Sequence, residues 1–197
     1  MNKKSGKLFD VLSFNKNLIK GLSKEKFSSI ALRYMILILI ALPNLWLFYF
    51  IFTPLTIYPV YYILNLSFDA SLLGNIIVLN KKIAIELIRA CIAGSAYYFL
   101  FVLNLATPKI KISKRIKMIF FAFLSLLIIN IFRIVLLSFV AYSGYSFFDI
   151  THKLFWYLMS VVFVVGIWFA EVKIFKIKTI PFYSDLKFLY KKSHLRK

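Results

Sequence analysis

Four long apolar stretches alternate with polar, mostly basic segments along the chain. They cover residues 31–52, 91–107, 118–142 and 154–169. Apolar runs of this length indicate transmembrane helices, because about 20 helical residues cross the hydrocarbon core of a bilayer. The pattern therefore predicts an all-α integral membrane protein, a polytopic bundle of about four transmembrane helices.

Two shorter features separate the first stretch from the second. Residues 54–66 are apolar but contain Pro54 and Pro59. A helix of about 13 residues reaches only roughly 20 Å, which is too short to cross the membrane. We therefore predict an interfacial or re-entrant segment on the outer side. Residues 75–85 have the pattern of two short strands around an Asn-Lys turn, which predicts a small outer hairpin.

Basic residues outnumber acidic residues by 26 to 7, for a formal net charge of +19. Such a charge is also typical of nucleic-acid binding. Here, however, the basic residues gather in blocks at residues 1–33, 109–117 and 173–197, each beside an apolar stretch. Basic segments next to membrane spans stay in the cytoplasm. We therefore predict cytoplasmic termini, an even number of spans and no nucleic-acid partner.

Three regions follow from these patterns. Residues 1–30 form a basic cytoplasmic segment with apolar residues at helical spacing, either an amphipathic helix on the membrane surface or a solvated tail. Residues 31–175 form the membrane domain, and residues 176–197 form a basic cytoplasmic tail. The chain is 61% hydrophobic with a mean hydropathy of +0.82, more than a soluble domain can bury. We therefore predict a multi-pass protein of the cell membrane.

Arg133 is a charged residue inside the third predicted span. A charge at that depth costs at least about 2.5–3.5 kcal/mol, so such a residue usually faces a polar cavity and has a function. Asn130 precedes it by one helical turn and shares its face. The alternative is an arginine that extends to the outer headgroups, with Asn130 joining two helices.

Cys91 is the only cysteine, and the charge pattern places it at the outer end of the second span. A lone cysteine in a membrane protein is more often a small packing residue. Its position favours a reactive thiol instead. Arg89 is a nearby cation, and Gly94 leaves room for close approach.

His152 lies in the short outer loop before the fourth span, either as a polar interfacial residue or as an acid–base group. Asp149, three residues earlier, would orient the imidazole if the loop is helical. The predicted topology places Cys91, Arg133 and His152 at one level of the membrane. The thiolate would attack a carbonyl, the imidazole would protonate the departing amine, and the guanidinium would stabilise the oxyanion.

Glu86 has two alternatives. We favour a structural hydrogen bond with Arg89 or Arg133 over a role in positioning substrate. A metal site built from Cys91, His152 and Glu86 has too few ligands and lacks the paired spacing of such sites. We therefore predict no metal and no cofactor.

These polar residues resemble the motifs of the exosortase/archaeosortase family, in particular its short archaeal members. The resemblance covers roughly residues 55–169 and includes an Asn-x-x-Arg helix. The residues that carry it are Ala90, Cys91, Gly94, Ser95, Asn130, Arg133 and His152.

The resemblance implies an integral-membrane cysteine transpeptidase. Enzymes of this family recognise a C-terminal sorting signal on secreted proteins, made of a short motif, a transmembrane helix and a basic cluster. They cleave near the motif and pass the new carboxyl end to a membrane lipid or lipid-linked acceptor. By match, Cys91 is the nucleophile, Arg133 the charge stabiliser and His152 the acid–base group.

The residues alone also allow a second class of function. This is a small non-enzymatic membrane transporter or assembly factor that binds an anionic lipid or solute through Arg133.

Overall fold

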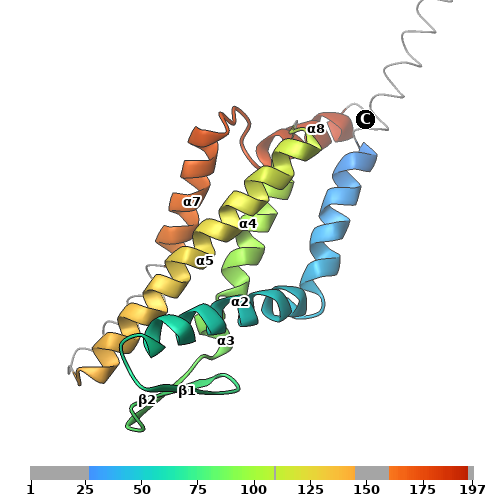
Figure 1. Cartoon of the computed structure of the whole chain (residues 1–197). Helices are drawn as coiled ribbons and strands as arrows, with labels where there is room; N and C mark the ends of the chain where they lie inside the picture. The colour runs from blue at the N-terminus through green and yellow to red at the C-terminus, as the bar shows by residue number, and fades with distance from the viewer. Residues whose placement is uncertain (1–26, 109, 145–159, 195–197) are drawn as a thin grey trace, which may run out of the picture. The chain divides into compact units, whose positions relative to one another are not determined.

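A computed structural model describes residues 27–108, 110–144 and 160–194. The chain divides into two compact units, Met1–Leu39 and Ile40–Lys197. The described part of the first unit lies in one helix, Phe27–Ala41, which ends just beyond that unit. The predicted amphipathic segment 1–30 lies almost entirely outside the described residues. The helices and strands from α2 onward belong to the second unit (Figure 1).

The first predicted span is not one helix, and that prediction was wrong. The helix Phe27–Ala41 ends before a turn, and α2, Trp46–Asn65, begins after it. Pro43 explains the break, because the residue before a proline avoids helical backbone angles. The two residues after Pro43 adopt left-handed backbone angles, with φ of 51° and 57°.

The predicted interfacial segment 54–66 does not stand alone either, because it falls within α2 up to Asn65. Pro54 and Pro59 lie inside this helix and do not end it. Proline is tolerated in apolar helices when neighbouring groups or small backbone adjustments satisfy the freed carbonyl. By length and composition, α2 is able to cross a membrane.

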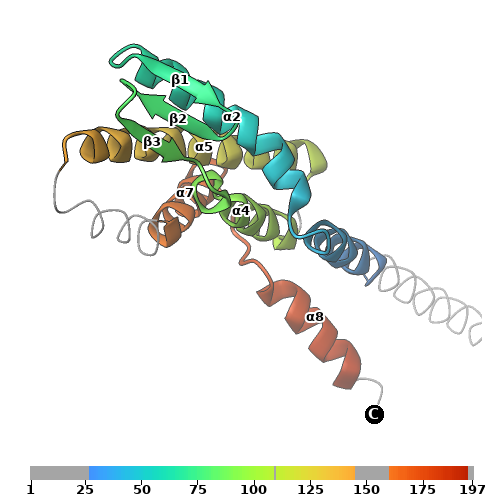
Figure 2. The same ribbon diagram turned by 90° about the horizontal axis from the view of Figure 1, so that it is seen from below.

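Three helices form the body of the second unit: α4, Gly94–Ala106, α5, Ile112–Tyr142, and α7, Ser160–Ile174. Both α4 and α7 run antiparallel to α5, whereas α2 lies obliquely across α5 (Figure 1, Figure 2). Among the described residues, α2, α5 and the stretch Arg89–Ala106 are long and apolar enough to span a membrane. The prediction of a helical membrane fold is confirmed at this level.

An aromatic cluster joins α2 to the other helices. The rings of Phe52 and Tyr97 are stacked, with centroids 3.6 Å apart. Phe123 of α5 meets both rings edge-on at 5.4 and 5.7 Å, and Phe48 packs against Phe123 at 5.9 Å. Edge-to-face pairs add to the free energy gained from burying the rings. This packing fixes α2 over the α4–α5 pair.

The basic loop 109–117 is shorter than predicted, because α5 already begins at Ile112. Arg115 is buried in the first turns of α5. It donates hydrogen bonds to the carbonyl oxygens of Leu105 at 3.0 Å and Thr107 at 2.8 Å. The last carbonyls of a helix lack partners within the helix, and a cation is favourable beside them. Arg115 therefore closes the corner between α4 and α5.

The segment after α7 returns to the same corner. The hydroxyl of Thr179 donates to the carbonyl of Pro108 at 3.2 Å, and the N–H of Phe182 donates to the carbonyl of Ala106 at 3.4 Å. The last helix, α8, Tyr183–His194, follows directly. The second and third basic blocks therefore lie at one end of the unit (Figure 1).

A three-stranded antiparallel sheet lies at the opposite end, where α5 finishes (Figure 2). Its strands are β1, Ala70–Leu73, β2, Ile76–Leu79, and β3, Ile83–Glu86, in the order β1-β2-β3. The predicted hairpin is confirmed as β2 and β3. β1 was missed, because its sequence Ala-Ser-Leu-Leu lacks the β-branched and aromatic residues typical of strands.

Asn80 in the hairpin turn ties the sheet to α5. Its side-chain nitrogen donates to the hydroxyl oxygen of Tyr142 at 2.8 Å, and its side-chain oxygen Oδ1 accepts from the N–H of Asp69 at 2.7 Å. The ring of Phe68 packs on that of Tyr142, with centroids 4.5 Å apart. These contacts hold the sheet against the last turn of α5.

A buried carboxylate joins α4 to α7 near the basic end. The side-chain amide of Asn104 donates to both carboxylate oxygens of Glu171, at 3.2 and 3.0 Å, and both residues have no exposed surface. Polar contacts of this kind hold apolar helices together where water is absent.

Candidate active site

Cys91 lies in a single helical turn between the sheet and α4. This turn, α3, covers Arg89–Ile92. It ends at Ala93, which has a left-handed backbone with φ 61° and ψ 36°, and α4 starts at the next residue. A non-glycine residue in that conformation costs of order 1–3 kcal/mol and persists only when its surroundings hold it. The half-buried Cys91 is therefore placed on a short turn of its own, outside the long helix.

Two polar residues of α5 reach this turn. The amide nitrogen of Asn130 donates to the Cys91 carbonyl oxygen at 2.8 Å, and Nη2 of Arg133 donates to the same oxygen at 3.4 Å. Asn130 is 3% exposed and Arg133 is 7% exposed. The structure therefore brings together three of the predicted site residues.

The charges around the sulfur have opposite effects. The Arg133 guanidinium lies within electrostatic range of Cys91. A neighbouring cation favours a thiolate, which is the nucleophilic form of cysteine. The Glu86 carboxylate is also within electrostatic range and acts in the opposite direction.

Glu86 is the last residue of β3, and its side chain is exposed. Within the described ranges, its carboxylate forms no ion pair or hydrogen bond with Arg89 or Arg133. The hydrogen bond that the favoured structural role requires is therefore not seen in the described contacts, and neither role of Glu86 is tested by them.

Gly94 allows close packing beside the cysteine turn. A Cβ atom at this position would lie 2.7 Å from two ring carbons of Tyr49, a separation that real Cβ atoms do not adopt. Arg89 also contacts this Tyr49 ring through a cation–π interaction, in which its guanidinium carbon lies 5.4 Å from the ring centroid. Tyr49 thus connects α2 to both ends of the turn. Sequence reasoning missed this residue, because its only signal is a place in an aromatic-rich stretch.

We expect Gly94→Ala to destabilise the protein by about 1–3 kcal/mol, because the added methyl group overpacks against Tyr49. Gly166→Ala is the matched control. It also adds a methyl group to a glycine in a helix, but a Cβ atom there meets nothing within 4 Å. Thermal unfolding of both variants in detergent micelles measures the difference. Equal melting temperatures for the two variants would contradict the described contact.

The remaining predicted residues, Asp149 and His152, lie outside the described residues. Among the residues that the structure does describe, no group of three His, Cys, Asp or Glu side chains is placed to hold a metal ion.

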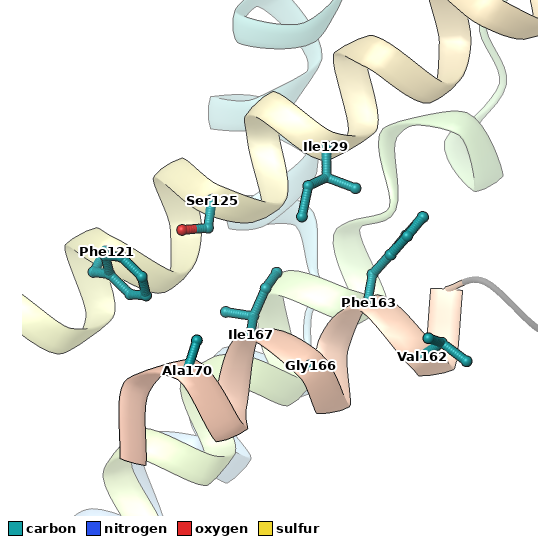
Figure 3. A pocket seen from close by; sticks show the side chains of 8 residues that line it. All are labelled: Phe121, Ser125, Ile129, Val162, Phe163, Gly166, Ile167 and Ala170. Atoms are coloured by element: carbon teal, nitrogen blue, oxygen red, sulfur yellow. The ribbon is translucent and has the colours of Figure 1, made fainter. Parts of the chain in front are cut away.

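A pocket of about 390 Å³ lies between α5 and α7, and no residue of the cysteine turn lines it (Figure 3). It is lined by Phe121, Ser125, Ile129, Val162, Phe163, Gly166, Ile167 and Ala170. Ser125 is the only residue in this lining with a polar side chain, and none of the predicted site residues is among them. The pocket offers an apolar groove without reactive groups.

No family model, curated protein or solved structure matches the chain.

Proposed function

We propose that the protein is a membrane-embedded cysteine transpeptidase or protease. It cleaves C-terminal sorting signals of secreted proteins at the outer face of the cell membrane and transfers the new carboxyl end to a membrane-linked acceptor. The observation that supports this proposal is the pair of hydrogen bonds from Asn130 and Arg133 to the Cys91 carbonyl. Two buried polar residues, about 40 positions away in the chain, converge on the only cysteine.

The proposed reaction has two steps. The Cys91 thiolate attacks the carbonyl carbon of the scissile peptide bond, and the carbonyl electron pair moves to oxygen. Collapse of this intermediate breaks the C–N bond, and the amine leaves with a proton, so that a thioester remains on Cys91. A hydroxyl or amine of the acceptor then attacks the thioester, gives its proton to the imidazole of His152, and breaks the C–S bond to restore the thiolate. Water in place of the acceptor gives hydrolysis.

Arg133 has two tasks in this proposal. A guanidinium carries five N–H donors in a planar fork, so one side chain is able to hold the Cys91 turn and also face a substrate oxygen. Donors fixed before the reaction stabilise the developing oxyanion at no further cost in reorganisation. Asn130 shares the first task and keeps the turn in place when Arg133 engages substrate.

His152 is the proposed acid–base group, and Asp149 is proposed to orient its ring. Both assignments come from the family resemblance and the order of the residues in the chain. Imidazole suits this task because its ordinary pKa lies close to neutral pH.

The substrate class is the one that the family resemblance implies, and a site in the membrane suits it. A sorting signal with its own transmembrane helix enters the same bilayer as the enzyme, which raises the effective concentration of the cleavage site near Cys91. This proximity compensates for weak recognition of a short motif. By the same resemblance, the proposed partners are secreted proteins with such a signal and a membrane lipid or lipid-linked acceptor.

A labelling experiment tests the proposed sidedness. Because Cys91 is the only cysteine, we expect a small membrane-impermeant thiosulfonate to modify the protein on intact cells. The matched control is the double variant Cys91→Ala/Lys117→Cys, whose thiol lies at an exposed position at the basic end. It should react only after the membrane is permeabilised. Labelling of Cys91 only after permeabilisation would place the sulfur on the cytoplasmic side and end the proposal.

A further inference from the structure

The free edge of the sheet lies on β3. β1 forms one edge and packs beside α2, whereas β3 forms the other edge and leads directly into the cysteine turn (Figure 2). Within the described residues, no strand pairs with the outer side of β3. An open strand edge presents a row of unpaired N–H and C=O groups that accept another extended chain.

The register shows which backbone groups point to this edge. The N–H of Leu87 donates to the carbonyl of Asn75 at 2.9 Å, just beyond the paired segments of β2 and β3. Residues opposite each other in an antiparallel ladder alternate between bonded and non-bonded pairs. Ile85 is therefore in a bonded pair, whereas Ala84 and Glu86 are in non-bonded pairs. The N–H and C=O groups of Ala84 and Glu86 point away from β2, toward the free edge.

The side chains of β3 leave this edge accessible. Ala84 and Glu86 are exposed, whereas Ile85 packs against the hydrophobic core. The strand thus stays attached to the protein by one face and by its bonds to β2. Its outer backbone groups remain open to a ligand within the described part of the chain.

The chain connects β3 to the candidate nucleophile over a short distance. Only Leu87 and Ile88 separate Glu86 from the start of α3, and Leu87 is anchored in the core with 2% of its surface exposed. The Glu86 carboxylate lies within electrostatic range of Cys91. A peptide paired with β3 would therefore be led to the sulfur.

We propose that the free edge of β3 binds the substrate's extended segment upstream of the cleavage site as a fourth strand. This inference rests on the proposed peptidase function and adds the mode of recognition. Backbone hydrogen bonds supply the affinity, and pockets for alternate side chains supply the selectivity. The transmembrane helix of the signal follows the cleavage site, so the upstream strand runs toward the membrane and parallel to β3.

This arrangement also predicts a preference in the substrate. Side chains of an added strand alternate between the two faces of the sheet. Those on the face of Ile85 meet apolar surface, and those on the other face meet Glu86. We expect apolar residues on the first face and a basic or hydrogen-bond-donating residue beside Glu86 on the second.

The first test changes the edge. The probe is a library of secreted reporters, each of which ends in a randomised six-residue segment, an apolar helix and a Lys/Arg cluster. Clones that the wild-type enzyme processes are selected from this library. We expect Ala84→Pro to reduce kcat/KM on the selected sequence roughly tenfold, the loss equivalent to one hydrogen bond. The N–H of Ala84 takes no part in the ladder with β2, and proline is accepted at such edge positions. Ala84→Ser keeps the N–H and should lose much less than Ala84→Pro.

The second test leaves the protein unchanged and so does not depend on how Ala84→Pro folds. Peptides of the selected sequence carry a single N-methyl group at each upstream position in turn. The measured quantity is the affinity of each peptide for full-length Cys91→Ala protein in nanodiscs. We expect this affinity to fall only for peptides methylated at every second position. Uniform losses, or equal rates for Ala84→Pro and Ala84→Ser, would overturn the edge site while the peptidase function stands. A library from which the wild-type enzyme processes no clone would overturn the proposed function and this site with it.

Discussion

Replacing Cys91 by alanine is expected to abolish processing of a secreted protein that carries the sorting signal. The rate should fall by at least about 10³-fold, because no thioester forms without the sulfur. The measurement is the fraction of reporter that is cleaved, detected as a gel shift, in cells that contain equal amounts of enzyme in the membrane. Cys91→Ser should lose nearly as much, because a serine hydroxyl needs a stronger base than a thiol does.

Ser95→Ala is the matched control for Cys91→Ala. Ser95 is an exposed hydroxyl one turn further along the chain, and it takes no part in the described contacts of the site. Its variant should process the reporter at the wild-type rate. Normal processing by Cys91→Ala would exclude covalent cysteine catalysis and would favour the non-enzymatic transporter or assembly factor, for which Cys91 is dispensable.

Arg133→Gln is expected to reduce kcat by about 10²–10³-fold, the loss typical when one donor to an oxyanion is removed. Glutamine keeps a single amide donor that preserves part of the contact with the Cys91 carbonyl, but it removes the charge and the fork. Arg133→Lys should give an intermediate rate. The measurement is single-turnover cleavage of the reporter by purified enzyme in nanodiscs.

Arg89→Gln is the matched control for Arg133→Gln. Both arginines lie near Cys91, but Arg89 is exposed and stacks on Tyr49, whereas Arg133 is buried and directed at the turn. Arg89→Gln should keep most of kcat. The alkylation rate of Cys91 separates chemistry from structure, since Arg133→Gln should also slow alkylation by an electrophile. Equal losses for both variants would show that Arg133 has no special role.

Only part of the arrangement around Cys91 was predictable from the sequence. Asn130 and Arg133 were paired by their helical spacing, which is a local property of one chain segment. That both residues bind the carbonyl of Cys91, not its sulfur, depends on how α5 packs against α3. The packing of Tyr49 over Gly94 joins residues from two helices, and no pattern along the chain encodes it.

The wrong predictions about the helices have the same origin, because helix limits also depend on tertiary packing and backbone angles. The apolar stretch before residue 52 looked continuous because hydrophobicity does not record backbone angles, and the turn after Pro43 divides it. With Pro54 and Pro59 inside it, the segment 54–66 looked separate from the apolar stretch before it and too short to cross the membrane. In the structure α2 continues through both, packed on α4 and α5 by its aromatic rings.

By itself, the sequence determined the membrane class, the strand pair around Asn80 and the shared helix face of Asn130 and Arg133. Hydrophobic runs, charge blocks and periodicity are local, and a bilayer requires them whatever the helices pack against. The tertiary structure alone decided that β1 completes the sheet, that Arg115 closes the α4–α5 corner, and that α5 meets the cysteine turn. The contact between α5 and the cysteine turn joins residues about 40 positions apart in the chain. In all three cases only the packing of side chains selects one arrangement from the many that the same pattern allows.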